Sequence, residues 1–302
     1  MKQLSTIIPT YNGQHLLAKN LPAVLVCLRD GDELMIVDDL SEDATVEWLR
    51  QGFKLQEQKK PELKDQYGSY QLLQGFYQSG NKRNSITLVV NDKNLRFGAS
   101  CNRGVQLAQH QLVLLLNNDV SPDTNCVQEL VSSFERSHEQ GGVFALGALE
   151  YEGHDTQAPK ADLPAQAGKN NLYFARGLFW HQKATEFTAG DTAWVSGGSG
   201  LFDRAKWLEL GGFDLSFYPA YWEDVDLAFR ARQKGWQVLF EPKAVVYHRH
   251  ESTNMTVFGA DKINKLSQRH QVYFTRKHAN LFQRLQYLLW RPYWWRQKLV
   301  KN

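Results

Sequence analysis

The chain has 302 residues, of which 42% are hydrophobic and 22% charged, and its formal net charge is +3. This composition is typical of a globular protein with a sizeable core and excludes a disordered or fibrous chain. The three cysteines share no CxxC spacing, so neither a disulfide framework nor a zinc site is indicated. No apolar run approaches the roughly 20 residues that a membrane-spanning helix needs, and no leader is evident, so we expect a cytoplasmic protein.

The first 120 residues alternate strand and helix signals. The expected strands are residues 4–9, 33–39, 85–90 and 111–116, and the expected helices are 13–28, 41–51 with Ser41 as the cap, and 99–110. This order predicts βαβ units, and therefore a mainly parallel central sheet with helices on both faces. The Gln- and Lys-rich segment 55–84 interrupts the rhythm and is expected to form a helix and loop excursion.

The second half has a different character. Residues 151–191 are rich in Gly, Pro and small polar groups, which favours flexible or strand-and-loop structure. A helix is expected from about Tyr221 to Lys234, followed by strands at 237–242 and 244–250. Leucines at helical spacing from Leu281 to Leu289 predict a C-terminal helix.

Polar side chains gather directly after four of the expected strands. These groups are Pro9 to Asn12, Asp38 and Asp39, Asn91 to Asn94, and Asn117 to Asp119. Each group alone is more often a turn than a binding site. In open α/β sheets, however, ligands bind at the carboxyl ends of the strands, so four polar strand ends together indicate a ligand site.

Six segments resemble glycosyltransferase family 2 in order and in spacing, over roughly residues 3–255. They read STIIPTYNG, MIVDDLSED, NDKNLRFGASCNRGVQLA, LLLNNDVSP, LGGFDLSFYPAYWEDVDLAFRARQKGW and VVYHRH. The likeness is greatest to the bacterial rhamnosyltransferase-like branch. It implies an inverting enzyme with a Rossmann-like GT-A domain at 1–255 and a helical tail at 256–302. The nucleotide-binding half would span about 1–120 and the acceptor half about 121–255.

The resemblance implies transfer of a sugar from a UDP- or dTDP-sugar to a glycan acceptor, free or lipid-linked, in bacterial cell-envelope polysaccharide synthesis. Asp39 would accept a hydrogen bond from a pyrimidine imide, which an ionised carboxylate can do. For Asn102, a structural hydrogen bond is as consistent with the sequence as contact with the ligand. For Gly197 and Gly198, a tight turn is as consistent with the sequence as a place in the site. The implied nucleotide-sugar site comprises Pro9, Thr10, Tyr11, Asn12, Asp39, Arg96, Asn102, Asn117, Asn118, Gly197 and Gly198.

The segment Asn117–Asn118–Asp119 matches the family's metal-binding DxD motif, with Asn117 in place of the first acid. Asp119 is then the one charged ligand of the motif, and the resemblance adds the imidazole of His248, with His250 as the fallback. A carboxylate suits Mg²⁺ and Mn²⁺ alike, while an imidazole favours Mn²⁺. The implied cofactor is a divalent metal that neutralises the leaving diphosphate.

A cluster of acids opens the helix that is expected after Tyr221. By resemblance Asp224 is the general base, Glu223 holds the acceptor or the base, and Trp222 is an acceptor-binding platform. Acids in a first turn also complement the helix dipole, worth about 0.3–1 kcal/mol each, and Trp222 is equally consistent with a core residue.

The C-terminal segment is basic and aromatic. Residues 262–302 carry ten Lys or Arg and no Asp or Glu, which leaves a net charge of −7 on residues 1–261. Trp and Tyr beside Arg suit a membrane interface, so we expect residues 281–302 to contact the inner face of the cell membrane peripherally. Packing on the catalytic domain and a homodimer contact are the alternatives. Nucleic acid is not an expected partner, because the acidic body opposes it.

Two other functions remain open at this point. One is a catalytically silent nucleotide-sugar-binding protein, which the substitution at Asn117 weakly favours. The other is a nucleotidyltransferase, which breaks a different phosphate bond and releases pyrophosphate.

Overall fold

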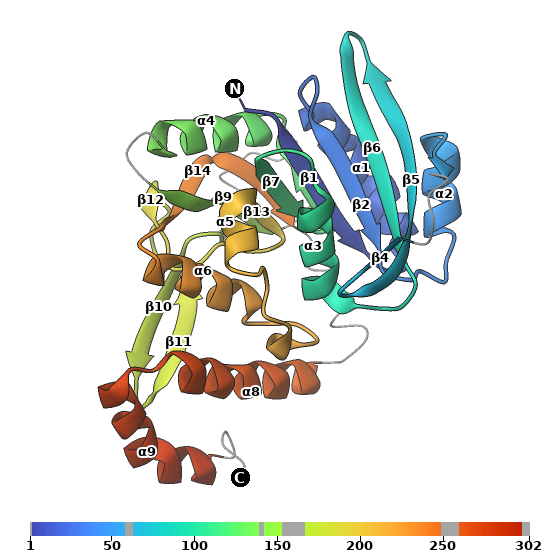
Figure 1. Cartoon of the computed structure of the whole chain (residues 1–302). Helices are drawn as coiled ribbons and strands as arrows, with labels where there is room; N and C mark the ends of the chain where they lie inside the picture. Colours follow the sequence, from blue (N-terminus) through green and yellow to red (C-terminus); the bar gives the residue numbers. More distant parts are fainter. Residues whose placement is uncertain (1, 58–62, 139–141, 153–166, 249–259, 298–302) are drawn as a thin grey trace.

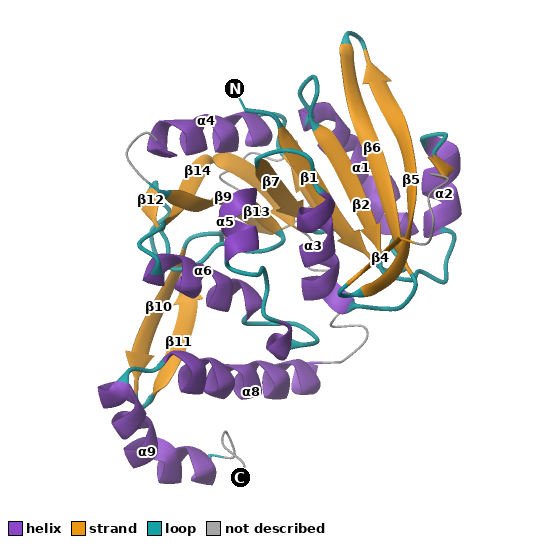
Figure 2. Cartoon of the chain, in the orientation of Figure 1, coloured by secondary structure: helices purple, strands orange, loops and turns teal. Residues whose placement is uncertain are grey.

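The computed structural model describes residues 2–57, 63–138, 142–152, 167–248 and 260–297. Within these residues, twelve strands form one sheet and two further strands form a separate hairpin (Figures 1 and 2). The strand order in the sheet is β12-β14-β9-β13-β7-β1-β2-β6-β5-β3, with β4 paired to β5 and β8 paired to β14.

The N-terminal half is built on four parallel strands in the order β7-β1-β2-β6. Their apolar runs are buried because helices cover the sheet, as is usual for parallel strands. The alternation of strand and helix confirms the predicted α/β class. The elements are β1 (Leu4–Thr10), α1 (Gln14–Cys27), β2 (Glu33–Asp38), α2 (Thr45–Gly52), β6 (Lys82–Asn91), α3 (Arg96–Leu107) and β7 (Leu112–Leu116).

The core has two main layers, one on each face of the sheet, and successive residues of β1 alternate between them. Leu17 of α1, Leu49 of α2 and Leu130 of α4 (Cys126–His138) pack in one layer. Val105 of α3 and Leu227 of α6 (Glu223–Gln233) pack in the other. The alternation follows from the period of two residues along a strand.

The second half extends the sheet with mixed pairing. Strand β13 runs antiparallel to both β7 and β9, and β14 runs parallel to β9. Two strands were expected at 237–242 and 244–250. They form one strand with a register shift between Glu241 and Val245, and its described part ends at His248. The remaining elements are β8 (Val120–Pro122), β9 (Val143–Glu152), β12 (Gly190–Asp191), β13 (Ser199–Asp203), α5 (Arg204–Glu209), the 3₁₀ turn Leu215–Phe217 and β14 (Gln237–His248).

The prediction of a helix and loop excursion at 55–84 is wrong for its described part. Strand β5 (Gly68–Ser79) pairs antiparallel with β6 from Tyr70 to Ser79. Two short strands, β3 (Gln56–Glu57) and β4 (Leu63–Asp65), also pair with β5. The turn between β5 and β6 uses Gly80 at φ +59°. The Gln residues of β5 misled the prediction, because they lie in a half-exposed strand near the sheet edge where polar side chains are tolerated.

The expected helix cap Ser41 is a second correction. Helix α2 begins at Thr45, and its cap residue Ala44 makes no side-chain hydrogen bond. The Ser41 hydroxyl instead accepts a hydrogen bond from Asn12 N at 2.8 Å, and Ser41 N donates to Asp38 Oδ1 at 3.0 Å. Ser41 therefore ties together the loops that follow β1 and β2.

The C-terminal segment forms α8 (Ala260–His278) and α9 (Leu281–Arg296). Helix α8 packs against the second half of the chain, where Phe274 shares a buried cluster with Phe179 and Trp222. Helix α9 packs on the hairpin of β10 (Asn170–Ala175) and β11 (Leu178–Lys183) through Tyr287 and Trp294. The division proposed at residue 255 falls among residues outside the described ranges.

Candidate functional site

A cavity of about 330 Å³ lies where the carboxyl ends of β1, β2 and β7 meet, a volume typical of small-molecule sites. It is the place where polar strand ends were expected to converge. Most of the predicted nucleotide-sugar and metal residues line it. The lining residues are Pro9, Thr10, Tyr11, Asp39, Asn94, Arg96, Phe97, Ser100, Asn117, Asn118, Asp119, Tyr221 and His248.

Asp39 shapes one wall of this cavity. Its Oδ1 accepts hydrogen bonds from Asn91 Nδ2, Leu95 N and Ser100 Oγ at 2.7–3.0 Å, and its Oδ2 accepts one from Arg96 N at 2.7 Å. These bonds hold Arg96 at φ +67°, a conformation that is strained for a residue other than glycine. Because Oδ2 carries a single protein hydrogen bond among those described, it retains a lone pair that can accept a further hydrogen bond.

Hydrogen bonds hold the loop that follows β1, which is called the first loop below. Thr10 Oγ1 accepts a hydrogen bond from Asn118 Nδ2 at 2.9 Å, which joins the ends of β1 and β7. Asn12 does not line the cavity. Its Oδ1 accepts from Glu42 N at 2.7 Å, so the geometry supports a loop-bracing role for Asn12 rather than ligand contact.

The glycines after Trp194 allow a close approach to the end of β7. Asn117 N donates to Gly198 O at 3.0 Å, and a Cβ on Gly198 would stand 2.6 Å from Asn117 Nδ2. A Cβ on Gly197 would stand 2.9 Å from the Phe213 ring. Neither glycine lines the cavity, so both act by letting Asn117 and its neighbours pack tightly behind its wall.

Asp119 and His248 meet at the cavity wall. Asp119 Oδ1 lies 3.1 Å from His248 Nε2, and Glu150 Oε2 lies 3.8 Å from His248 Nδ1. Burial alone would lower the pKa of His248, but hydrogen bonding and attraction from Asp119 and Glu150 raise it to about 10. The two carboxylates therefore favour the protonated imidazole, and a metal ion bound at His248 would take the place of that proton.

Glu150 was missed by the sequence reasoning. It is 8% exposed and also accepts a hydrogen bond from Ser199 Oγ. The signal was a lone acid near the end of the apolar run VFALGALEYE of β9. Its partner His248 is distant in the sequence, so no local pattern revealed their pairing.

The pair formed by Asp119 and His248 fits a divalent metal in the chemistry of its donors, because Mn²⁺ accepts both carboxylate oxygen and imidazole nitrogen. Among the described residues, no group of three or more His, Cys, Asp or Glu side chains is arranged to hold an ion. An ion here would accordingly take two ligands from the protein and the rest from phosphate oxygens and water. His250, the fallback ligand, lies outside the described residues.

The two acids that open α6 lie behind the cavity. Asp224 is half-buried, accepts a hydrogen bond from Val225 N at 2.8 Å and from Gly197 N, and is close enough to Glu150 to be repelled by it. Glu223 is 8% exposed, and no described group hydrogen-bonds its Oε2. Burial raises the pKa of both carboxyls, and their mutual repulsion raises that of Glu223 further. Glu150 thus links the acid pair to His248 electrostatically.

Glu223 is expected to reduce stability at neutral pH, and its replacement by Gln should raise the free energy of unfolding by about 1 kcal/mol. A carboxyl whose pKa is raised on folding imposes no penalty below its unfolded pKa of about 4.3, and the penalty grows as the pH rises towards the folded pKa. Urea unfolding of the wild type and E223Q should give equal midpoints near pH 4 and diverging midpoints towards pH 8. Parallel midpoints across this range would contradict the prediction.

Two predicted site residues are structural. Asn102 uses both atoms of its carboxamide on the main chain of Phe213, at 2.8 and 2.9 Å, and does not line the cavity. Trp222 is 4% exposed, its ring lies against His181 and Phe274, and its Nε1 donates to Ser267 Oγ. Trp222 therefore offers no open face to a sugar, which corrects its expected role as a platform.

Comparisons with known proteins indicate the family of the chain. A model described as "Glycosyltransferase like family 2" matches residues 76–266, and one described as "Glycosyl transferase family 2" matches residues 5–66. The N-acetylglucosaminyl-diphospho-decaprenol L-rhamnosyltransferase of Mycobacterium tuberculosis is 25% identical over 239 residues, which are 71% of this chain and 71% of that protein.

Two solved structures share the fold at low identity. The mannosyltransferase PcManGT of Pyrobaculum calidifontis, in complex with GDP-Man and Mn²⁺, has a TM-score of 0.58 at 16% identity over 91% of this chain and 64% of that one. TarS of S. aureus (1–349), in complex with UDP-GlcNAc, has a TM-score of 0.56 at 14% identity over 90% of this chain and 66% of that one. The chain therefore spans just under two thirds of these solved chains.

The fold is of the GT-A type, as the resemblance implied, and the cavity lies at its strand ends. Because a family model covers more than half of its length, the chain belongs to glycosyltransferase family 2.

Proposed function

We propose that the protein transfers a sugar, with inversion, from a UDP- or dTDP-sugar to a hydroxyl of a lipid-linked glycan during cell-envelope polysaccharide synthesis. The proposal is carried by one observation: Asp119, His248 and Glu150 lie together beside a cavity at the strand ends. The Asp224 carboxylate is close enough to Glu150 to interact with it electrostatically. The relative from M. tuberculosis, named for a lipid-linked N-acetylglucosamine acceptor and rhamnosyl transfer, supports this choice of substrates.

The cavity has two chemically distinct ends, and these orient the donor. The end formed by Pro9, Tyr11 and Asp39 offers flat apolar surface and an acceptor-only carboxylate, which suit a pyrimidine base. The end formed by Asp119 and His248 offers a carboxylate and an imidazole that would hold a metal ion, and positive charge there suits a diphosphate. A donor bound in this direction places its sugar next to the segment Gly197–Gly198 and to α6.

Asp224 is the proposed general base. Its raised pKa makes it a better proton acceptor than an ordinary carboxylate, and the Gly197 and Val225 N–H groups hold it in one orientation. The acceptor hydroxyl loses its proton to Asp224 as its oxygen bonds to the anomeric carbon, and the bond from that carbon to the diphosphate oxygen breaks. The diphosphate leaves on the side of Asp119 and His248, opposite to the attack, which inverts the anomeric centre.

A divalent metal, Mn²⁺ or Mg²⁺, would bind at Asp119 and His248 and would supply positive charge to the leaving diphosphate. PcManGT, which shares the fold, was solved with Mn²⁺. The fit rests on the donor set described above.

Asp119→Asn should raise the Mn²⁺ concentration for half-maximal activity by at least about tenfold, because it removes the charged oxygen ligand. The measurement is transfer by chelator-treated enzyme against added Mn²⁺. Glu42→Gln, a change of an exposed acid beside the first loop, is the matched control and should leave the curve unchanged. Full activity of both enzymes in excess chelator would show that the reaction runs without a metal.

The experiment that tests the proposed function uses a panel of UDP- and dTDP-sugars. A donor should protect the protein against thermal unfolding, since a ligand that binds the native state alone raises its apparent stability. With a lipid-linked glycan acceptor, free nucleoside diphosphate should appear in step with the glycosylated product. Pyrophosphate would instead indicate a nucleotidyltransferase, and protection without turnover would indicate a silent nucleotide-sugar-binding protein.

We further propose a cytoplasmic location at the inner face of the membrane, which a lipid-linked acceptor requires. The three cysteines are unpaired and buried, as is usual in a reducing compartment. No helix in the described part of the chain is long and apolar enough to cross a bilayer. The proposed contact with the membrane is through the C-terminal segment 281–302, which is basic and aromatic.

A further inference from the structure

Helix α9 uses a narrow face to join the rest of the protein. Tyr287 and Trp294, seven residues apart and so on one side of the helix, are its two buried residues. Trp294 Nε1 donates to Arg176 O at 2.7 Å, and its ring packs on Trp180. Gly177 lies so close to the helix that a Cβ there would stand 2.8 Å from Tyr287 Cα. These contacts fix which side of α9 faces outward.

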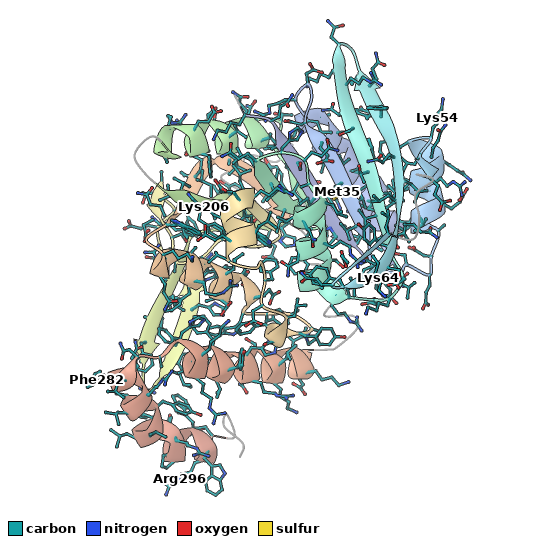
Figure 3. All side chains as sticks on the ribbon, in the orientation of Figure 1. Met35, Lys54, Lys64, Lys206, Phe282 and Arg296 are labelled. Atoms are coloured by element: carbon teal, nitrogen blue, oxygen red, sulfur yellow. The ribbon has the colours of Figure 1, made fainter. Side chains whose placement is uncertain are left out.

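The outward side of α9 is apolar, the reverse of an ordinary surface helix. Leu281 and Leu289 are 77% and 79% exposed. Figure 3 shows Phe282 and Arg296 at opposite ends of α9, with Arg296 projecting away from the body. The outward apolar face comprises Leu281, Phe282, Leu285, Leu288, Leu289 and Trp295.

Basic residues accompany this face and acids do not. Arg284, Arg291 and Arg296 lie on the exposed part of α9, and the sequence has no Asp or Glu after Asp261. Trp290 and Tyr293 flank the face with rings that are 37% and 38% exposed. Apolar residues beside cations and interfacial aromatics match the boundary between acyl chains and anionic headgroups.

We infer that the outward face of α9 docks on an anionic lipid bilayer, with its apolar side chains among the acyl chains and its arginines at the headgroups. A second copy of the chain is a poorer occupant, because pairing two such faces brings six arginines together without a carboxylate on either helix. The inference rests on the proposed function in one respect: a lipid-linked acceptor gives the enzyme a reason to bind a membrane. In Figure 1, α8 lies on the side of the molecule towards which β1 and β2 run, and α9 follows it at the outer end of the β10–β11 hairpin.

The test is co-sedimentation of the full chain with vesicles of phosphatidylcholine alone or with 30 mol% phosphatidylglycerol, a composition set at roughly the anionic content of a charged leaflet. Binding should be at least about tenfold tighter to the anionic vesicles. The double variant Leu285→Glu/Leu289→Glu should weaken that binding by at least about tenfold, because two exposed side chains no longer enter the bilayer. Arg284→Gln/Arg296→Gln should weaken it and flatten its dependence on salt.

The matched control is Val26→Glu/Leu208→Glu, which places the same charges at exposed apolar positions on α1 and α5 and should bind vesicles like the wild type. Light scattering in solution should show the same mass for the wild type and the α9 variants. Unchanged vesicle binding by Leu285→Glu/Leu289→Glu, or a wild-type dimer that this variant dissociates, would overturn the inference. Vesicle binding is measured without a donor sugar. A failure to detect the proposed transfer activity would therefore not affect the outcome of this test.

Discussion

Replacing Asp224 by Asn is expected to lower the rate of sugar transfer by roughly 10²- to 10⁴-fold, because the amide cannot accept the proton of the attacking hydroxyl. Donor binding should be unchanged, since Asp224 does not line the cavity where the nucleotide is proposed to bind. The measurement is kcat with saturating donor and acceptor, combined with thermal protection by the donor.

Glu209→Gln, which alters an exposed acid on α5, serves as the control and should retain wild-type kcat. The pH profile supplies a second readout. Burial raises the pKa of the Asp224 carboxyl, so the acid limb of kcat/KM should lie well above the ordinary carboxyl value of about 3.9, and activity should increase with pH through this limb. An Asp224→Asn enzyme with wild-type kcat would assign the base to another residue.

Replacing Asp226 by Ala should lower the free energy of unfolding by about 3 kcal/mol, the magnitude for removing one partner of a buried ion pair. The carboxylate is fully buried. Its oxygens lie within hydrogen-bond distance of Arg230 Nε at 2.6 Å, Lys277 Nζ at 2.6 Å and His278 Nε2 at 2.7 Å. Its removal leaves these groups without their shared anion. Urea unfolding at pH 7 measures the loss.

The pKa of Asp226 adds a pH signature to this loss. Burial tends to raise that pKa, but the hydrogen bond with His278 and the charges of Arg230 and Lys277 outweigh burial and lower it. The contribution of Asp226 is therefore complete above its unfolded pKa of about 3.9 and disappears as the pH falls through the folded pKa.

The wild type and Asp226→Ala should accordingly become more alike in acid. Asp191→Ala, which removes an exposed ion pair with Arg232, should cost no more than about 1 kcal/mol at any pH. A loss of similar size for the two variants would contradict the role of Asp226 as a buried junction.

The parallel half of the sheet was predictable because its signals are local. A strand buried on both faces is a short apolar run, and the polar residues that end it follow directly in the sequence, as in the strand 112–116 and Asp119. The family resemblance then supplied His248, whose position beside Asp119 depends on the pairing of β14 with β8. Strand ends and the resemblance together located most of the cavity.

The features that sequence reasoning missed depend on distant partners. Glu150 is a site residue because β9 and β14 run side by side, and no local pattern encodes that pairing. Trp222 resembled a sugar platform in the sequence, but α8 covers its ring. The contact is made by Phe274, which follows Trp222 by some fifty positions in the chain. The strand β5 was missed because its exposed face is polar and half-buried strands at a sheet edge carry weak periodicity.

The link between Asp226 and α8 has a consequence for how the enzyme matures. Two of the three side chains that contact the Asp226 carboxylate stand 51 and 52 positions after it in the sequence, on the C-terminal part of α8. During synthesis at the ribosome, α6 emerges with Arg230 as the partner of Asp226 and without the two partners that α8 supplies. Helix α6 therefore gains the full set of partners for Asp226 only after α8 has been synthesised and has packed against it.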